Sequence, residues 1–324
     1  MGMTHPLHPV PRTDLPRPRG ARPLAGSAHV WWDAADLAQA DALSAPRPIL
    51  PALPTDRPLV MGIVNVTPDS FSDGGTLGDV ADAVARARAM VAAGADILDI
   101  GGESTRPGAA EVPVKDEIAR TAPVIAAIRA AGVSTPISID TRKAAVADAA
   151  LKAGADIVND VSALSWDPAL ARVVAEAGVP ICLMHAQGTP QTMQKAPHYG
   201  DVLIEVYDHL ARRMDHAVAQ GIAADRLISD VGIGFGKTLT HNLTLLKGLA
   251  LFHSLGAPIL LGASRKRFIG TLSGVDEAPL RMPGSVAVAL WAAAQGAQIL
   301  RVHDVAETVQ ALALWRAMTL ETDE

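Results

Sequence analysis

Residues 93–101 of the sequence are Ala-Gly-Ala-Asp-Ile-Leu-Asp-Ile-Gly, a pattern that indicates the fold class. An Ala-rich stretch with helical spacing ends at Gly94, and a run of strand-forming residues starts two positions later. Glycine can end a helix in the left-handed conformation, so that the next strand begins at once. The same Ala-Gly-Ala-Asp pattern recurs at residues 153–156, and Gln-Gly-Ala-Gln at residues 295–298 is similar. These junctions predict repeated βα units.

The chain from Arg57 onward repeats this unit. We predict strands near residues 59–65, 96–101, 136–140, 155–159, 179–184, 226–230, 258–262 and 297–302. Helices are expected near residues 79–93, 114–131, 143–153, 168–177, 201–220, 241–255, 283–295 and 304–319. Eight consecutive units predict an α/β fold with a closed TIM (β/α)₈ barrel. An open doubly wound sheet is the alternative, but no Gly-x-Gly-x-x-Gly turn follows the first strand.

Residues 1–56 are dense in Pro and Arg and form an irregular N-terminal extension to the barrel of residues 57–324. They lack sustained periodicity, apart from a possible short helix around residues 31–34. This composition predicts a flexible terminus that adds nothing to the core and whose removal leaves catalysis nearly unchanged.

Composition excludes several classes of protein. The net charge of −6 is spread without a basic stripe, which argues against a nucleic-acid partner. No stretch approaches the roughly 18 apolar residues of a membrane span, and the N-terminus lacks the apolar segment of a signal peptide, so we expect a cytoplasmic protein. The single cysteine, Cys182, lies in an apolar run and is predicted to be a buried structural thiol.

Polar side chains stand at nearly every predicted strand end, where barrel enzymes carry their reactive groups. A lone Asp after a strand is usually an N-cap of the next helix, but repetition around the barrel favours a shared ligand site. Asp140 is the plainest case, because Thr141 can cap instead. The strand-end residues are Asn65, Asp99, Glu103, Asp140, Asn159, Asp160, His185, Asp230, Ser264, Arg265, Lys266, Arg301 and His303.

Two loops rich in Gly, Ser and Thr, at residues 67–75 and 101–108, have the composition of lids over a ligand. Four cationic or imidazole side chains can converge at the barrel mouth and point to a phosphate-bearing ligand. They are Arg106, Lys266, Arg301 and His303. The amide oxygen of Asn65 suits a single protein ligand of Mg²⁺, whose other ligands would be diphosphate and water.

Residues 232–238 resemble a nucleotide P-loop only superficially. A P-loop needs glycine five residues before the Gly of its Gly-Lys-Thr step, and that position is Val231. ATP binding is therefore rejected. The sequence also lacks His or Cys pairs at zinc spacing and a Gly-x-Ser-x-Gly elbow.

Eight motifs together resemble the dihydropteroate synthase family. The longest are MGIVNVTPDSFSDGG at residues 61–75 and DIGGESTRPG at residues 99–108. The others follow in the family's order at residues 138–141, 159–160, 183–185, 234–237, 264–266 and 301–305. One departure is Val231, where the family commonly has Pro, and the residues before Leu59 match nothing in the family's common core.

The resemblance implies the condensation of 6-hydroxymethyl-7,8-dihydropterin diphosphate with 4-aminobenzoate to give 7,8-dihydropteroate and diphosphate in folate biosynthesis. It also implies Mg²⁺, a homodimer and a sulfonamide target. Asn65 would bind the metal, and Lys266, Asp140 and Arg106 would carry catalysis. The implied pterin residues are Asp140, Asn159, Asp230 and Lys266, with Met184 also in the substrate site. The implied diphosphate residues are Thr105, Arg106, Arg301 and His303, and Phe71, Pro107, Phe235 and Lys266 would border the aminobenzoate.

Two other functions are weighed against this one. A pterin-dependent methyltransferase barrel would share the pterin residues but has no diphosphate to hold, so Thr105, Arg106, Arg301 and His303 argue against it. A catalytically silent binding barrel would have lost Lys266, Asp140 or the two loops, and all are retained.

Overall fold

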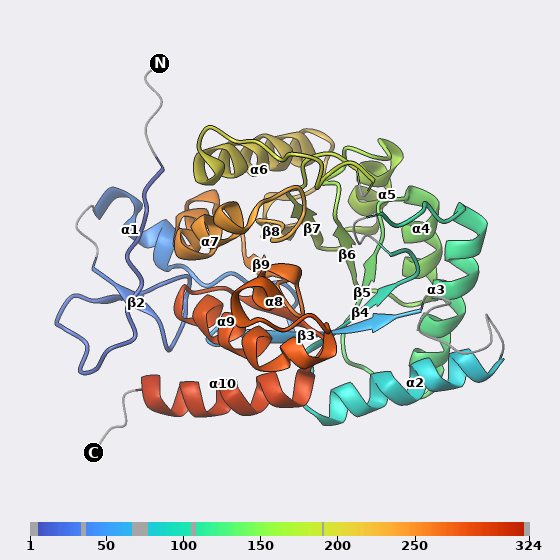
Figure 1. Ribbon diagram of the computed structural model, residues 1–324, viewed down its shortest axis with the longest axis horizontal. Coiled ribbons are helices and arrows are strands. Elements are labelled where there is room, and N and C mark those ends of the chain that lie inside the picture. The colour runs from blue at the N-terminus through green and yellow to red at the C-terminus, as the bar shows by residue number, and fades with distance from the viewer. Residues whose placement is uncertain (1–5, 34–36, 67–76, 105–107, 190, 321–324) are drawn as a thin grey trace.

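The computed structural model describes residues 6–33, 37–66, 77–104, 108–189 and 191–320. Eight parallel strands close into a barrel in the order β10-β3-β4-β5-β6-β7-β8-β9, so the open sheet is excluded (Figure 1). Each strand lies within two residues of its predicted bounds. The strands are β3 (Leu59–Asn65), β4 (Ile97–Gly101), β5 (Ile137–Asp140), β6 (Ile157–Asp160), β7 (Ile181–Met184), β8 (Leu227–Asp230), β9 (Ile259–Leu261) and β10 (Ile299–Val302).

Helices surround the barrel, most of them at the predicted places (Figure 1). They are α2 (Leu77–Ala92), α3 (Val114–Ala130), α4 (Ala144–Ala153), α5 (Ala169–Ala177), α6 (Val202–Ala219), α7 (Leu239–Lys247), α8 (Arg267–Ser273), α9 (Met282–Ala294) and α10 (Val305–Thr319). Short 3₁₀ helices are η2 (Ala224–Arg226), η3 (Leu249–Leu255) and η4 (Pro279–Arg281). Within the described residues, no helix is both long enough and apolar enough to cross a membrane.

The α-helices of the barrel differ from the prediction at two places. The single helix expected at residues 241–255 is divided at Gly248 into α7 and η3, and the side chain of Leu203 packs where a Cβ on Gly248 would lie, 2.7 Å away. Helix α8 was not predicted, because seven residues are too few to show a helical period.

The predicted helix-to-strand junctions are confirmed. Their glycines have left-handed backbone conformations, with φ of +100° at Gly94, +113° at Gly154 and +84° at Gly296. Strand pairing starts two residues further on, as where the amide of Asp156 donates to the carbonyl of Ile137 at 2.7 Å. The chain therefore turns from helix into barrel without a longer loop.

Side chains that point into the barrel change character along the strands. The first inward positions form one apolar cluster, made of Leu59, Met61, Ile97, Ile157, Cys182, Ile228, Leu260 and Ile299. The alternate positions belong to a second cluster that includes the helices, as expected for strands buried on both faces. Cys182 is buried, as predicted. Toward the strand ends the inward positions become polar.

The N-terminal segment differs from its prediction. A helix around residues 31–34 was expected, but Trp31–Trp32 forms strand β2, which pairs antiparallel with β1 (Arg22–Pro23). Trp31 also exchanges backbone hydrogen bonds with Arg12, at 2.8 and 2.9 Å. Bulky aromatic side chains favour such a pleated, buried setting over a short isolated helix. Helix α1 (Leu37–Ser44) follows.

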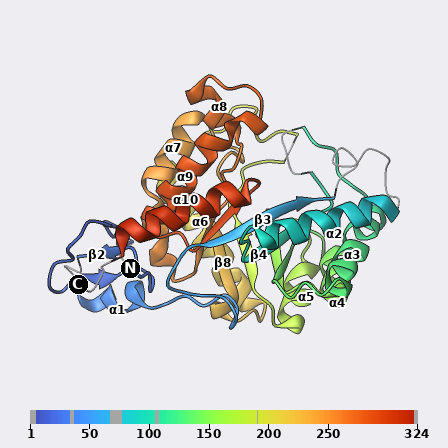
Figure 2. The same ribbon diagram turned by 90° about the horizontal axis from the view of Figure 1, so that it is seen from below.

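The expectation that this segment adds nothing to the core is wrong. Ile49 is 5% exposed and joins the apolar cluster inside the barrel, with Leu50 and Leu53 packed beside it. Arg47 is buried and donates to the carbonyls of Ala257 and His253, both at 2.7 Å. Figure 2 shows β2 and α1 at one side of the barrel, with the arrowhead of β3 pointing away from them. The segment closes the end of the barrel opposite the strand ends.

We predict that Arg47→Met lowers the free energy of unfolding by about 1–3 kcal/mol, because the Ala257 carbonyl loses the Arg47 donor and the His253 carbonyl keeps only the Gly256 N–H. Burial already lowers the pKa of Arg47 to about 10, so relief of its desolvation offsets part of the loss. Chemical denaturation measures the change, with Arg19→Met at an exposed position as the control. Equal stability of both variants would show that Arg47 does not fix the segment.

Candidate functional site

The polar ends of neighbouring strands lie at one level because of the strand register. Asp140 on β5 is in register with Gly101 on one side and Asn159 on the other, and Met184 on β7 with Asp230 on β8. Asp140, Asn159, Met184 and Asp230 are each no more than 8% exposed. Four of the sequence-predicted site residues therefore line the same end of the barrel interior.

Arg301 lies inside the barrel among carboxylates. Its Nε donates to Oδ2 of Asp99 at 2.6 Å and its Nη2 to Oδ2 of Asp140 at 2.7 Å. The amide of Asn159 donates to the same Asp99 oxygen at 3.5 Å. Because the guanidinium joins two buried carboxylates, Arg301 is not part of a surface salt bridge. Oδ1 of Asp99 is buried without a hydrogen-bond partner among the described residues.

Asp230 faces Arg301 across a gap that a glycine keeps open. Its Oδ1 accepts from the amide of Gly232 at 2.8 Å. A Cβ on Gly262 would lie 3.8 Å from both Asp230 Oδ2 and Arg301 Cδ. Any longer side chain at residue 262 would therefore fill the space between these two groups.

Burial changes the acidity of these carboxyl groups. Desolvation raises the pKa of Asp140 to about 7, although the charge of Arg301 opposes the shift. Desolvation also raises the pKa of Asp230. Asp140 can thus exchange a proton near neutral pH, as groups in functional sites often do.

The loop after β8 folds around a buried lysine. Lys237 is 3% exposed, and its Nζ donates to the carbonyls of Gly232 (2.9 Å), Phe235 (3.0 Å) and His185 (3.3 Å). Burial lowers the pKa of Lys237 to about 7 and that of His185 to about 2. Neutral His185 places Nδ1 2.9 Å from Nζ, so four acceptors share the three N–H groups of the ammonium. A P-loop lysine reaches phosphate instead, so this contact supports the rejection of ATP binding.

Lys266 and Phe235 come together at the barrel mouth. Nζ of Lys266 lies 3.9 Å from the centroid of the Phe235 ring, within the range of a cation–π contact. The lysine stem crosses Gly234, where a Cβ would lie 3.1 Å from Cδ of Lys266. Glycine at residue 234 thus lets the side chain reach the ring.

The structure describes some of the remaining predicted site residues and not others. His303 contacts Ser264 twice, with its backbone N–H 3.2 Å and its Nδ1 3.0 Å from the hydroxyl. A Cβ on Gly101 would lie 3.9 Å from Oδ1 of Asn65 and 3.5 Å from Cβ of Asp140, so Asn65 lies beside the end of β5. The side chain of Arg265 forms an ion pair with Asp304, in which Nε of Arg265 donates to Oδ2 of Asp304 at 3.0 Å. Phe71, Thr105, Arg106 and Pro107 lie outside the described residues.

Comparison with known proteins agrees with this geometry. Residues 61–303 match the model of a family described as pterin binding enzyme. A dihydropteroate synthase from Escherichia coli (strain K12) is 50% identical over 273 residues, which cover 84% of this chain and 95% of that protein. The chain belongs to the dihydropteroate synthase family.

Solved structures of the family agree. A dihydropteroate synthase from Xanthomonas albilineans with 4-aminobenzoic acid shares 50% identity, covers 82% of this chain and 95% of that one, and has a TM-score of 0.77. Another from the same organism, in complex with 7,8-dihydropteroate, shares 47% identity, covers 83% and 97%, and has a TM-score of 0.76. These similarities argue against the two alternative functions, a pterin-dependent methyltransferase and a catalytically silent binding barrel.

Sequence reasoning missed part of the site. Asp99 was noted at a strand end but given no role, although it anchors both Arg301 and Asn159. Lys237 belongs to the rejected P-loop and to the motif at residues 234–237, but the sequence assigns it no role in the site. Glu117 was not singled out at all, because a glutamate in the first turn of an amphipathic helix normally faces solvent, whereas here it is fully buried.

We predict that bare 6-hydroxymethylpterin binds about ten-fold more weakly at pH 6 than at pH 8, because Asp140 accepts a proton below a pKa of about 7 and loses acceptor capacity. Calorimetric titration at several pH values in this range measures how the pterin affinity changes with pH. Asp140→Asn should remove this pH dependence, and the same pH dependence in that variant would assign the titration to another group.

Proposed function

We propose that the chain catalyses the dihydropteroate synthase reaction with the pterin held by Asp140, Asn159 and Asp230 inside the barrel mouth. The supporting observation is that two buried carboxyl groups and an amide face one space at the strand ends. A pterin edge presents ring N–H and amino donors beside acceptors, which such groups can pair with. An analogue without this edge would leave them unsatisfied, which produces selectivity.

The reaction joins two substrates at one carbon. The aminobenzoate nitrogen attacks the pterin methylene carbon, the carbon–oxygen bond to diphosphate breaks, and the amine loses one proton to solvent. Negative charge grows on the leaving oxygens. Lys266, Arg301 and His303 stand at the mouth to stabilise it, with Thr105 and Arg106 as the sequence predicts.

Ser264 orients the ring of His303. Its hydroxyl oxygen accepts from the His303 backbone N–H and lies 3.0 Å from Nδ1, to which the hydroxyl can donate. We propose the tautomer in which Nε2 carries the ring hydrogen, because that hydrogen can be donated to a diphosphate oxygen. Ser264 thereby acts through His303 and not on the substrate.

Mg²⁺ is proposed with Asn65 as its protein ligand. The described residues contain no group of three or more His, Cys, Asp or Glu side chains that could hold a metal ion. One amide oxygen at the barrel mouth suits a metal that takes its other ligands from diphosphate and water. When bound, the ion would neutralise leaving-group charge.

The aminobenzoate site is proposed at Phe235 and the stem of Lys266, whose contact forms an apolar and cationic wall. Such a wall suits an aromatic ring carrying a carboxylate. Phe71 and Pro107 complete this proposal from the sequence alone. A related structure from Yersinia pestis is a sulfonamide drug complex, and we propose that this chain is also a sulfonamide target.

A homodimer is proposed across the C-terminal helices. Large apolar side chains are exposed on α8, η4, α9 and α10, and α9 contacts each of the other three elements. They are Leu272 (58%), Leu280 (62%), Trp291 (47%), Leu314 (64%) and Met318 (71%). Exposed apolar surface on neighbouring elements is a common feature of protein interfaces. The cytoplasmic location stays a prediction.

The proposed function is tested by an assay of diphosphate release, which should require both substrates.

We predict that Asp230→Asn weakens pterin binding about ten- to a hundred-fold, because an amide donor replaces an acceptor in a charge-assisted hydrogen bond. Calorimetry measures the affinity, with Asp148→Asn on the exposed face of α4 as the control. Pterin affinity that is equal in both variants would remove Asp230 from the site.

For the metal, we predict that Asn65→Ala and chelation of Mg²⁺ each weaken binding of the pterin diphosphate but not of the bare pterin, because only the diphosphate shares the ion. Titration of both ligands, with and without chelator, separates the two effects. A chelator that leaves diphosphate-ester affinity intact would contradict the metal proposal.

A further inference from the structure

Four charged side chains form a buried cluster beside the site, which we name the loop-base cluster. Glu103 follows β4, Glu117 lies on α3, and Arg142 and Lys143 lie between β5 and α4. None is more than 8% exposed. Two negative and two positive charges balance, as burial of ions requires.

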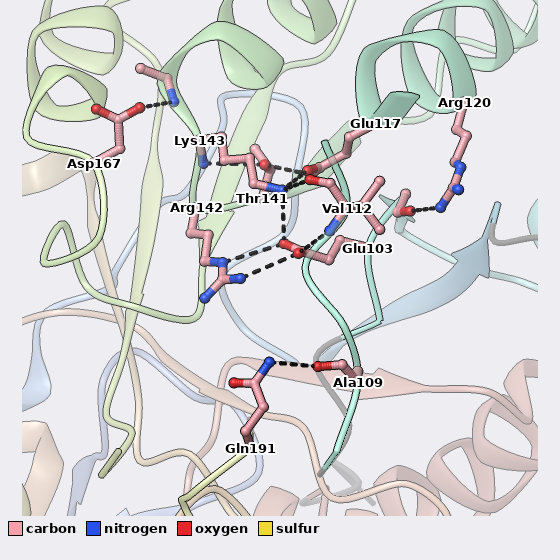
Figure 3. A network of polar contacts seen from close by, with 12 residues as sticks. Glu103, Ala109, Val112, Glu117, Arg120, Thr141, Arg142, Lys143, Asp167 and Gln191 are labelled. Atoms are coloured by element: carbon pink, nitrogen blue, oxygen red, sulfur yellow. Dashed lines mark hydrogen bonds and ion pairs between the residues drawn. The ribbon is translucent and has the colours of Figure 1, made fainter. Parts of the chain in front are cut away.

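Lys143 is the centre of the cluster. Its Nζ donates to Glu117 Oε2 at 2.6 Å and to the carbonyl of Val112 at 2.6 Å, and lies 3.2 Å from Glu103 Oε2 (Figure 3). The three donors of the ammonium thus have three acceptors. One of these is the backbone just before α3, so Lys143 fixes the end of the connection between β4 and α3.

Glu103 lies at the other end of the connection between β4 and α3, just after β4. Its Oε1 accepts from the amide of Val112 at 2.9 Å and from Arg142 Nη2 at 3.2 Å. Its Oε2 accepts from Arg142 Nε at 3.3 Å. The chain leaves the barrel at Glu103 and returns at Val112, so one side chain joins both ends. Gln191 adds a contact outside the cluster, donating to the carbonyl of Ala109 at 2.9 Å.

The cluster is continuous with the pterin site. Arg142 and Lys143 follow Asp140 by two and three residues, and the intervening Thr141 donates to Glu117 Oε1 at 2.7 Å. Arg142 also lies over the Trp166 ring, 3.6 Å from its centroid. The backbone that carries Asp140 and the base of the β4–α3 connection are therefore parts of one hydrogen-bonded unit.

We propose that Glu103 and Lys143 are positioning residues for the diphosphate. Their contacts join Glu103 and Val112, which flank the predicted diphosphate residues Thr105 and Arg106 in the sequence, to the backbone that follows Asp140. The inference rests on the proposed function. Neither residue touches substrate, and each acts through the backbone at Val112.

Glu103→Gln is the sharpest variant, because it preserves shape. Every contact of both carboxylate oxygens is with an N–H donor, so the Gln amide group meets a donor whichever way it turns. Lys143→Met removes the ammonium at similar length. Arg57→Met is the matched control, since Arg57 pairs with Asp96 at 2.7 Å near the starts of β3 and β4, at the opposite end of the barrel.

The experiment measures, for each variant, the affinity for the bare pterin and for pterin diphosphate with Mg²⁺, the melting temperature, and kcat/KM. We expect Glu103→Gln and Lys143→Met to lose about ten- to a hundred-fold in diphosphate-ester affinity and kcat/KM, as for a misplaced binding group, with bare-pterin affinity within about two-fold. Arg57→Met should change the melting temperature alone.

The positioning role would be overturned if the variants lost equal affinity for the bare pterin and for pterin diphosphate. It would also be overturned if they lost affinity for neither ligand. If Lys143→Met does not fold, the isosteric Glu103→Gln decides. A wild-type protein that neither binds pterin diphosphate nor releases diphosphate would instead refute the proposed function, and the two failures are thereby distinguished.

Discussion

The bonds from Arg301 to Asp99 and Asp140 are the interaction on which the rest of the site depends. Buried carboxylates repel one another and lose solvation, so they need a cation among them. Arg301 is 202 residues from Asp99 in the sequence, and pairing of β10 with β3 brings them together. The site can therefore form only when the barrel closes. In an open sheet, β10 and β3 would lie at opposite edges, and Arg301 could not reach Asp99 on β4.

The same strands divide the molecule into a stable end and a reactive end. Inward side chains at the strand starts are apolar and are covered by Ile49 from the N-terminal segment. Those at the strand ends carry charge and hydrogen-bonding groups, which costs stability. The apolar end and the Arg47 contacts compensate for this cost, so the N-terminal segment supports the site without approaching it.

Much of this arrangement could be predicted from the sequence. The fold followed from the glycine junctions at residues 94, 154 and 296, because a left-handed helix end and an immediate strand are local features. The meeting of Asp140, Asn159 and Asp230 at one end of the barrel followed from their place at strand ends. Their motifs also made the family recognisable.

The remainder depends on contacts between distant segments. Arg47 and His253 are 206 residues apart, and nothing local shows that they meet. The amide of Ala144 at the start of α4 is capped by Asp167 from the next βα unit, not by Thr141. Glu117 looks like a solvent-exposed helix residue until Lys143 is placed against it. A composition rich in Pro and Arg indicated flexibility for a segment that tertiary packing fixes.

Binding of a pterin by Asp140, Asn159 and Asp230 inside the barrel can be observed in a crystal structure of the protein with 6-hydroxymethylpterin diphosphate and Mg²⁺. We expect the ring edge within hydrogen-bond distance of all three side chains, and the diphosphate beside Lys266, Arg301 and His303. A pterin bound elsewhere, with the space between Asp230 and Arg301 empty, would show that these strand ends do not form the pterin site.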